Sequence, residues 1–273
     1  MTVTGIETND LEVLISHIRH ISGFDFSGYS RPSLLRRVSR YMTKHAVDFT
    51  ELLGGLSEGG SVVYDFIQEL TVNYTEMFRD VDFFLRVRGT IFPYLESYPT
   101  LRIWTAGCAS GEEPYSVGIL LKEAGLYDRS FIYATDISNR VLNTGREGIF
   151  NMNKMRGFSE NYLLSGGTHS LSDYYRVLYG KAVMIPELRK NIVFSIHDLT
   201  GDGVFNEFHL IFCRNVLIYF TLEQRRQVFL NLYKSLAIFG FLCIGKRESF
   251  KNSGIEEHFK IIDSKLNIYQ KIS

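Results

Sequence analysis

Acidic side chains recur in this sequence just after short apolar segments, at a spacing that could form a ligand site. Glu112 and Glu113 follow the first such segment after a turn that contains glycine and serine. Asp136 ends the second segment, and Asp198 follows the third. The carboxyl ends of parallel strands share one edge of a sheet, where ligands of open α/β sheets bind. Carboxylates at a helix N-terminus repel a pyrophosphate, so we expect an adenosine that carries a cationic sulfonium or amino group rather than NAD or ATP.

Each of these carboxylates also has a purely structural interpretation. Glu112 and Glu113 could simply complement the dipole of the helix that they begin. Asp136 could cap a helix that starts near Ser138, and Asp198 could be an ordinary turn residue. The predicted site therefore depends on the carboxylates occurring together after three successive strands.

Short apolar runs alternate with helical periodicity from Leu101 onward, which predicts a parallel α/β sheet. The tail, residues 259–272, predicts a terminal antiparallel hairpin. Residues 150–190 interrupt the alternation and are interpreted as an insertion with strand character around 174–184. The expected strands are 101–107, 131–136, 192–196, 210–213 and 241–245, with helices at 112–124, from about 138, and around 229–236.

The first part of the chain is expected to be helical, because apolar residues repeat there at helical spacing and no strand-like alternation occurs before Pro99. We therefore expect a helical domain over residues 1–92. The α/β domain then covers 93–273, with a β-subdomain inserted at about 168–190. The second helix, which begins near Pro32, has the most basic surface of the chain, formed by Arg31, Arg36, Arg37 and Arg40.

Composition excludes several classes of protein. The chain has 30 basic and 30 acidic side chains, a balance that disfavours general nucleic-acid binding. Its three cysteines, without partner spacing, suit a reducing compartment and indicate neither a disulfide framework nor a zinc site. The histidines are scattered, so no metal is expected. No secretory leader is visible, and no apolar run reaches the roughly 20 residues of a membrane span, so we predict a cytoplasmic protein without membrane insertion.

Three longer motifs make the interpretation specific. They are Thr71-Val-Asn-Tyr-Thr-Glu-Met-Phe-Arg-Asp80, Ala109-Ser-Gly-Glu-Glu-Pro-Tyr-Ser116 and Phe212-Cys-Arg-Asn-Val-Leu-Ile-Tyr-Phe220. In this order they resemble three signatures of the CheR-type chemotaxis methyltransferases, which esterify glutamates on chemoreceptors with S-adenosylmethionine. The resemblance covers most of the chain, including the helical N-terminal domain and the inserted β-subdomain. It implies a Rossmann-like, doubly wound methyltransferase sheet.

The resemblance also implies site residues. Arg79 and Tyr219 match positions close to the transferring methyl group, and the basic helix matches the side that recognises substrate. The implied partner is the cytoplasmic helical region of a chemoreceptor-like protein, the implied product of the cofactor is S-adenosylhomocysteine, and a monomer is expected. The positions that match cofactor contacts are Asn73, Thr75, Arg79, Glu113, Asp136, Asp198, Leu199, Arg214 and Asn215.

The chain departs from the family pattern at three places. Met77 stands where an aromatic residue is usual, and both are bulky and apolar. Asp198 replaces what is often asparagine, but an aspartate still accepts a hydrogen bond from an adenine amino group. After the last long strand the family often reads Gly-His-Ser-Glu, whereas this chain has Gly245-Lys-Arg-Glu248. That change adds positive charge near the expected substrate cleft.

The expected reaction needs no general base, because a glutamate side chain with an ordinary pKa of about 4.3 is already an ionised nucleophile near neutral pH. An arginine and a tyrosine hydroxyl could orient the carboxylate.

As structural alternatives, Arg79 could form a surface salt bridge with Asp80 or Asp82, Tyr219 could be a core aromatic residue, and the basic helix could be a solvated face. As functional alternatives, we consider a CheR-like module that binds the cofactor without catalysis, and a nucleic-acid methyltransferase. The latter lacks an Asn/Asp-Pro-Pro-Tyr type motif for a flipped base.

Overall fold

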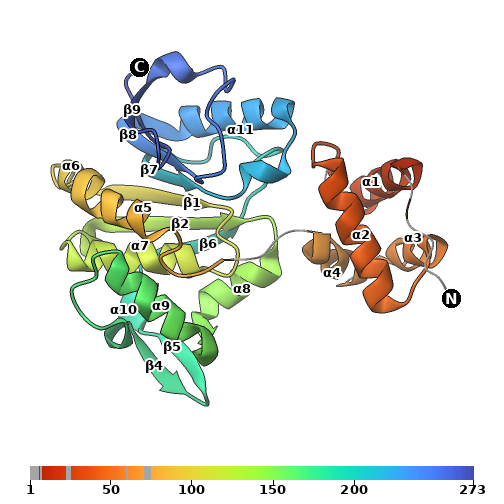
Figure 1. Ribbon diagram of the computed structural model, residues 1–273, viewed down its shortest axis with the longest axis horizontal. Helices are drawn as coiled ribbons and strands as arrows, with labels where there is room; N and C mark the ends of the chain where they lie inside the picture. The colour runs from red at the N-terminus through yellow and green to blue at the C-terminus, as the bar shows by residue number, and fades with distance from the viewer. Residues whose placement is uncertain (1–5, 7, 23–25, 60, 71–74) are drawn as a thin grey trace. The chain divides into compact units, whose positions relative to one another are not determined.

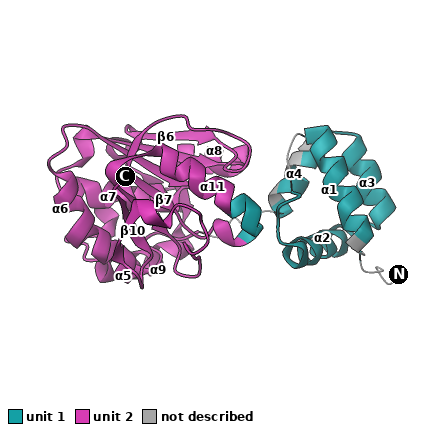
Figure 2. Ribbon diagram, turned by 90° about the horizontal axis from the view of Figure 1, so that it is seen from above, with its two compact units in different colours: residues 1–73, 219–225 teal, residues 74–218, 226–273 magenta. Residues whose placement is uncertain are grey.

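The chain forms two compact units in the computed structural model, coloured separately in Figure 2. Unit 1 comprises residues 1–73 and 219–225, and unit 2 comprises residues 74–218 and 226–273. The structure describes residues 6, 8–22, 26–59, 61–70 and 75–273.

Unit 1 is helical, as its sequence periodicity predicts. Its helices are amphipathic, and they enclose an apolar core that includes Leu14, Leu34 and Phe66. The short segment 219–225 belongs to this unit, since the backbone N–H of Ser30 donates to the carbonyl of Tyr219 at 3.0 Å. The helices are α1 (Thr8–Ser22), α2 (Arg31–His45), α3 (Phe49–Ser57) and α4 (Ser61–Leu70).

Unit 2 is built on a seven-stranded sheet with the strand order β6-β2-β1-β7-β8-β10-β9 (Figure 1). The first five strands in this order run parallel, and β10 and β9 are antiparallel to their neighbours. The C-terminal hairpin predicted from the sequence is therefore confirmed, and it extends the sheet beyond β8. The strands are β1 (Leu101–Ala106), β2 (Ser130–Asp136), β6 (Ile192–Ile196), β7 (Phe208–Cys213), β8 (Leu236–Ile244), β9 (Phe259–Asp263) and β10 (Ile268–Lys271).

Helices cover both faces of this sheet, and α7 and α11 lie on opposite faces (Figure 1). The helix α7 begins directly after the turn that follows β1, so its N-terminus lies at the carboxyl edge of the sheet. The helices of unit 2 are α5 (Val81–Arg86), the π-helix η1 (Val87–Ile91), α6 (Phe92–Leu95), α7 (Glu112–Glu123), η2 (Tyr127–Arg129), α8 (Asn139–Glu147), α9 (Met152–Leu164), η3 (Leu171–Tyr174), α10 (Pro186–Arg189) and η5 (Glu256–His258). The helix α11 (Leu222–Ser235) begins in the segment of unit 1 and continues in unit 2 from Arg226. The 3₁₀ helix η4 (Leu217–Tyr219) spans the junction of the two units.

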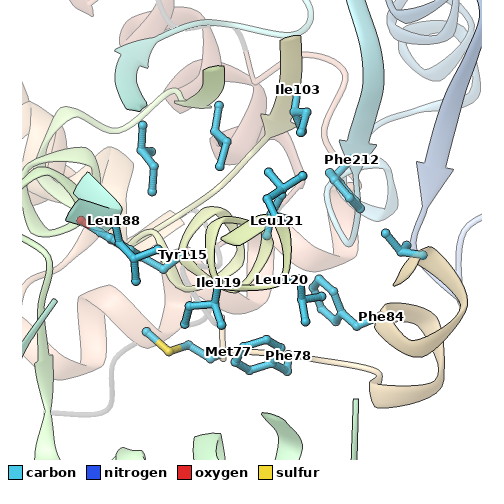
Figure 3. Close-up of a cluster of buried hydrophobic side chains, with 14 of the residues drawn as sticks. Met77, Phe78, Phe84, Ile103, Tyr115, Ile119, Leu120, Leu121, Leu188 and Phe212 are labelled. Atoms are coloured by element: carbon cyan, nitrogen blue, oxygen red, sulfur yellow. The ribbon is translucent and has the colours of Figure 1, made fainter. Parts of the chain in front are cut away.

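The core of unit 2 surrounds α7, which is buried on nearly every side. Figure 3 shows Ile103 and Phe212 of the sheet on one side of this helix and Met77 and Phe78 on another. Met77 fills a fully buried position, so an apolar residue without an aromatic ring is accommodated there. Residues 75–92, which the sequence pattern groups with the helical domain, pack in this core because their apolar side chains face α7 and the sheet.

The insertion predicted from the sequence contains a small antiparallel sheet with the strand order β3-β5-β4. Glu123, at the end of α7, anchors this region, because its carboxylate accepts hydrogen bonds from Tyr162 and, at 3.1 Å, from Tyr174. The same carboxylate pairs with Arg88 of η1. The strands of the small sheet are β3 (Ile149–Asn151), β4 (Tyr175–Leu178) and β5 (Lys181–Met184). The α/β class expected from the sequence is thus confirmed.

Candidate active site at the carboxyl edge of the sheet

The turn after β1 approaches the loop after β7 so closely that only glycine fits at its first position. Gly107 has a φ of +71°, and a Cβ atom built on it would lie 2.3 Å from Cγ2 of Val216. A side chain would therefore separate the two loops. Since β1 and β7 are adjacent parallel strands, this contact joins two of the segments that the sequence singles out.

Asp136, the last residue of β2, fixes the same turn. One carboxylate oxygen accepts the N–H of Ala109 at 3.0 Å, and the other accepts the N–H of Ser138 at 3.0 Å. Burial raises the pKa of Asp136, while these backbone N–H groups act in the opposite direction. Asp136 thus connects the ends of β1 and β2, and it also accepts the N–H of Ser138, although the cap residue of α8 is Ser138 rather than Asp136.

A buried ion network lies at the N-terminus of α7. Nη1 of Arg214, the residue after β7, is 2.7 Å from Oε2 of Glu113, and its Nη2 is 2.7 Å from Oδ2 of Asp80. The Arg214 side chain is only 2% exposed, and its guanidinium lies 4.0 Å from the centre of the Phe83 ring. Burial raises the pKa of Glu113, and the charges of Arg214 and Arg79 oppose that rise. One guanidinium therefore holds two carboxylates from separate segments.

Arg79 belongs to a tightly constrained turn beside this network. Its neighbours Phe78 and Asp80 both have positive φ angles, 54° and 62°, which non-glycine residues rarely adopt. The carbonyl of Arg79 accepts a hydrogen bond from Nη2 of Arg214 at 3.1 Å, and the N–H of Phe78 donates to Oγ of Ser116 at 2.9 Å. Such strain persists only where the surroundings enforce it, and it is concentrated at functional sites.

The two adjacent glutamates of the turn differ in their surroundings. Unlike Glu113, Glu112 is only 1% exposed and accepts a hydrogen bond from Oγ of Ser110 at 2.6 Å. Its other oxygen lies 3.8 Å from Nζ of Lys154 on α9, and burial raises its pKa. The sequence analysis expected Glu112 and Glu113 to act together at the ligand site, whereas in the structure only Glu113 joins the arginine network.

Three further predicted cofactor positions, Asp198, Leu199 and Asn215, lie on the loops that follow β6 and β7 at the same edge. Oδ1 of Asp198 accepts from both the N–H and the hydroxyl of Thr200, at 2.8 and 2.7 Å, which matches its interpretation as a turn residue. Leu199 beside it is buried. Asn215 has a φ of +62°, and its N–H donates to Oε2 of Glu248 at 3.0 Å. Thr75 is half-buried, four residues before Arg79.

Two family models match this chain in succession. Residues 9–71 match the model described as CheR methyltransferase, all-alpha domain, and residues 73–268 match CheR methyltransferase, SAM binding domain. This chain belongs to the CheR methyltransferase family. It is an S-adenosylmethionine-dependent methyltransferase of the chemotaxis type, as its sequence motifs indicated.

Relatives of this CheR-family chain match along most of its length. A candidate methyltransferase of Pseudomonas putida, Cher3, is 37% identical over 98% of this chain and 100% of its own length. The chemotaxis protein methyltransferase of Listeria monocytogenes is 31% identical over 84% of this chain and 86% of its own length. That of Borreliella burgdorferi is 31% identical over 91% of this chain and 90% of its own length.

The acceptor-rich edge of this CheR domain suits the family's cofactor. S-adenosylmethionine presents a cationic sulfur, an amino group, ribose hydroxyls and an adenine amino group, and all of these favour carboxylate or carbonyl partners. Glu113, Asp136 and Asp198 follow three strands at this edge, and each is a carboxylate. The side chain of Arg214 donates to Glu113, Asp80 and the Arg79 carbonyl, and its predicted cofactor contact stays a prediction.

Three residues of this CheR site were given no role from the sequence. Asp80 is the second carboxylate of the Arg214 network, whereas the sequence analysis named it only as an alternative salt-bridge partner of Arg79. Glu248 accepts hydrogen bonds from the N–H groups of Asn215 and Gly245. The feature of the sequence that could have indicated this role is its position in the Gly-Lys-Arg-Glu segment. Lys246 of that segment pairs with Asp82.

The two other predicted site residues cannot be added to this cluster. Asn73 lies outside the described residues. Tyr219 belongs to unit 1, where the guanidinium of Arg37 lies 5.8 Å from the centre of its ring. The predicted pairing of Tyr219 with Arg79 therefore stays a prediction.

The four arginines of the basic helix α2 differ in their exposure and in their partners. Arg31 pairs with Glu12 of α1 at 2.5 Å, so an acidic partner that is distant in the sequence compensates it. Arg37 is half-buried, and burial lowers its pKa. Arg36 and Arg40 are exposed, and they remain the surface residues of the predicted substrate face.

The described part of the chain offers neither a metal-binding cluster nor a membrane-spanning helix. Among these residues, no group of three or more His, Cys, Asp or Glu side chains could hold a metal ion. None of the helices formed by these residues is both long and apolar enough to span a membrane.

Proposed function

We propose that this CheR-family enzyme methylates the γ-carboxylate of glutamate residues on a chemoreceptor-like protein and forms glutamate methyl esters. The observation that carries the proposal is the position of Arg79 beside the network of Arg214, Glu113 and Asp80. The backbone of Arg79 is held by its carbonyl, and a guanidinium is a suitable partner for a substrate carboxylate, since it offers paired N–H donors in a fixed plane. The names of the Listeria and Borreliella relatives support a chemotaxis substrate.

The reaction requires orientation more than acid–base chemistry. S-adenosylmethionine, when bound, supplies a methyl group on a cationic sulfur, and an ionised glutamate accepts it without a base. In this proposal Arg79 orients the carboxylate, and Tyr219 adds a hydroxyl donor. Correct alignment of the reacting atoms accounts for a large part of such a rate enhancement.

The remaining parts of the site hold the cofactor in this proposal. Glu113 and Asp136 bind its cationic and hydroxyl groups, and Asp198 accepts from the adenine. The family motifs imply that these contacts are completed by Asn73, Thr75, Leu199, Arg214 and Asn215.

The enzyme acts in the cytoplasm, where Arg36 and Arg40 of α2 face the acidic helical region of the receptor. Rim charges of this kind mainly raise the rate of encounter.

Labelled methyl transfer tests the proposal. The enzyme is incubated with methyl-labelled S-adenosylmethionine and membranes from cells that overproduce one chemoreceptor, and the product is then treated with alkali. We expect label on the receptor that alkali releases as volatile methanol, because a carboxyl ester is base-labile. A receptor in which the methylated glutamates are replaced by alanine serves as the control.

Two outcomes would contradict this function. Label that resists alkali would indicate N-methylation, and an unlabelled receptor together with normal binding of S-adenosylhomocysteine would favour a cofactor-binding module without catalysis.

A further inference from the structure

Lys246 connects the loop after β8 to the first turn of α5. Its Nζ atom lies 2.7 Å from both carboxylate oxygens of Asp82 and 4.0 Å from Oδ1 of Asp80. The hydrogen bond from Lys246 lowers the pKa of Asp82. Lys246 therefore faces both acidic residues of the segment that follows Arg79.

Lys246 compensates the third carboxylate among the paired ionic groups beside Arg79. Glu113 and Asp80 share the single guanidinium of Arg214, and Asp82 adds a third carboxylate. Arg214, Lys246 and Arg79 supply three positive charges against these three carboxylates. Without Lys246 the cluster has a net negative charge, which would repel an incoming glutamate side chain.

We propose that Lys246 is a specificity-determining positioning residue, which neutralises Asp82 and Asp80 so that the site beside Arg79 admits an anionic side chain. This inference rests on the proposed function and names the residue that makes the site receptive to carboxylates. Lys246 occupies the position at which the family often has histidine. A lysine stays charged throughout the neutral range, whereas an ordinary histidine loses its charge above about pH 6.5.

The solvent exposure of the Lys246–Asp82 pair distinguishes a role in substrate binding from a role in folding stability. The side chains of Lys246 and Asp82 are 35% and 58% exposed, and ion pairs this accessible contribute little to folding stability. Their effect on an approaching charge is different, because an unpaired carboxylate acts over several ångströms at low salt. Removal of Lys246 should therefore change substrate affinity and leave unfolding almost unchanged.

Steady-state methylation of chemoreceptor-containing membranes at low salt tests the inference in the full chain. For Lys246→Met we expect the KM for receptor to rise roughly 3- to 10-fold with a smaller change in kcat, and the rise to shrink at high salt. Adding Asp82→Asn to this variant should bring KM back to within about twofold of the original, since it removes the uncompensated charge. The affinity for S-adenosylhomocysteine, measured by calorimetry, should stay constant in both variants.

A matched control uses another exposed lysine–aspartate pair of unit 2. Lys190 lies 2.9 Å from Asp128, which precedes β2 and so lies near the amino end of the strands. Lys190→Met removes the same type of pair, and we expect it to leave the KM for receptor unchanged.

A histidine variant adds a readout that packing alone would not produce. Lys246→His should match the original enzyme near pH 6 and resemble Lys246→Met near pH 8, because its imidazole loses its charge between these values. An unchanged KM in Lys246→Met at low salt, or a raised KM that Asp82→Asn does not restore, would overturn the inference while the proposed function stands. Absence of base-labile methylation by the original enzyme, with cofactor binding intact, would overturn both.

Discussion

Arg214 illustrates at the residue scale how a buried charge can organise a site. Its guanidinium donates to two carboxylates and one carbonyl and lies against the Phe83 ring. A buried ion pair adds little net stability, yet the loss of one partner is costly because the other charge remains uncompensated. The network is therefore best understood as a frame that holds Glu113 and the Arg79 backbone in fixed positions.

Arg79 gives the prediction at this scale. Arg79→Ala should lower kcat/KM for receptor methylation by roughly 10- to 100-fold, since hydrogen bonds to a charged group contribute about 1.5–3 kcal/mol. Arg79→Lys should recover only part of this loss, because an ammonium lacks the paired donors of a guanidinium. The measurement is steady-state transfer of labelled methyl groups to receptor membranes.

Arg86 provides the control for this prediction. It lies on α5 and pairs with Asp263 at 3.3 Å, so Arg86→Ala removes a neighbouring arginine that has no assigned role in the reaction. Its turnover should remain normal. Equal turnover of the Arg79 and Arg86 variants would remove Arg79 from the proposed active site.

At the scale of elements, the loop after β7 depends on a carboxylate from the loop after β8. Oε2 of Glu248 accepts the N–H groups of Gly245, at 2.5 Å, and Asn215, at 3.0 Å. Burial raises the pKa of Glu248, and these N–H groups, with those of Leu217 and Ile218, act against the rise. Glu248 thus fixes the segment that carries Arg214 and Asn215.

We predict that Glu248→Ala weakens cofactor binding as well as the fold. The change leaves buried N–H groups without an acceptor, at about 1–3 kcal/mol for each group, and it frees the loop that carries Arg214. Calorimetry with S-adenosylhomocysteine should show a raised Kd, and Glu248→Gln should be milder because its amide oxygen can still accept.

Glu256 supplies a matched comparison. Its exposed carboxylate also accepts two backbone N–H groups, those of Ser253 at 3.0 Å and Gly254 at 2.9 Å, in a turn between β8 and β9. Glu256→Ala should lower stability without changing the Kd for S-adenosylhomocysteine. If the Glu248 and Glu256 variants bound the cofactor equally well, Glu248 would have no role in positioning the loop.

At the scale of the whole molecule, Glu123 joins α7 to the π-helix and to the inserted region. Burial tends to raise its pKa, but hydrogen bonds from Tyr162, Arg88 and the N–H of Thr168 outweigh this and lower it from 4.5 to about 2. A depressed pKa stabilises the folded state above the unfolded pKa, and this stability is lost as the pH falls through the folded pKa.

We therefore predict a contribution of about 3 kcal/mol from Glu123 that is present above pH 4.5 and is lost progressively toward pH 2. Urea unfolding between pH 6 and 2.5 should show a steeper loss of stability in the original protein than in Glu123→Gln. Glu160→Gln, which removes a surface carboxylate paired with Arg156, should follow the original curve. Parallel curves for the original protein and Glu123→Gln would contradict the prediction.

Sequence alone determined the order of the helices and strands and the edge of the sheet at which the cofactor site is predicted. Helical and strand periodicities are local properties, so the strands, the α7 helix and the C-terminal hairpin could be predicted from neighbouring residues. Asp136 and Glu113 could be assigned to the carboxyl edge for the same reason, since each directly follows a strand or its turn. The three motifs then identified the family.

Only the tertiary structure decided which charges meet. Arg214 is 101 residues from Glu113 and 134 from Asp80 in the sequence, and no local pattern relates them. Burial likewise separated Glu112 from Glu113, since adjacent residues at the start of a helix point in different directions. Residues 75–92 joined the α/β unit because their apolar side chains fill its core, and such packing depends on the assembled sheet rather than on helical propensity.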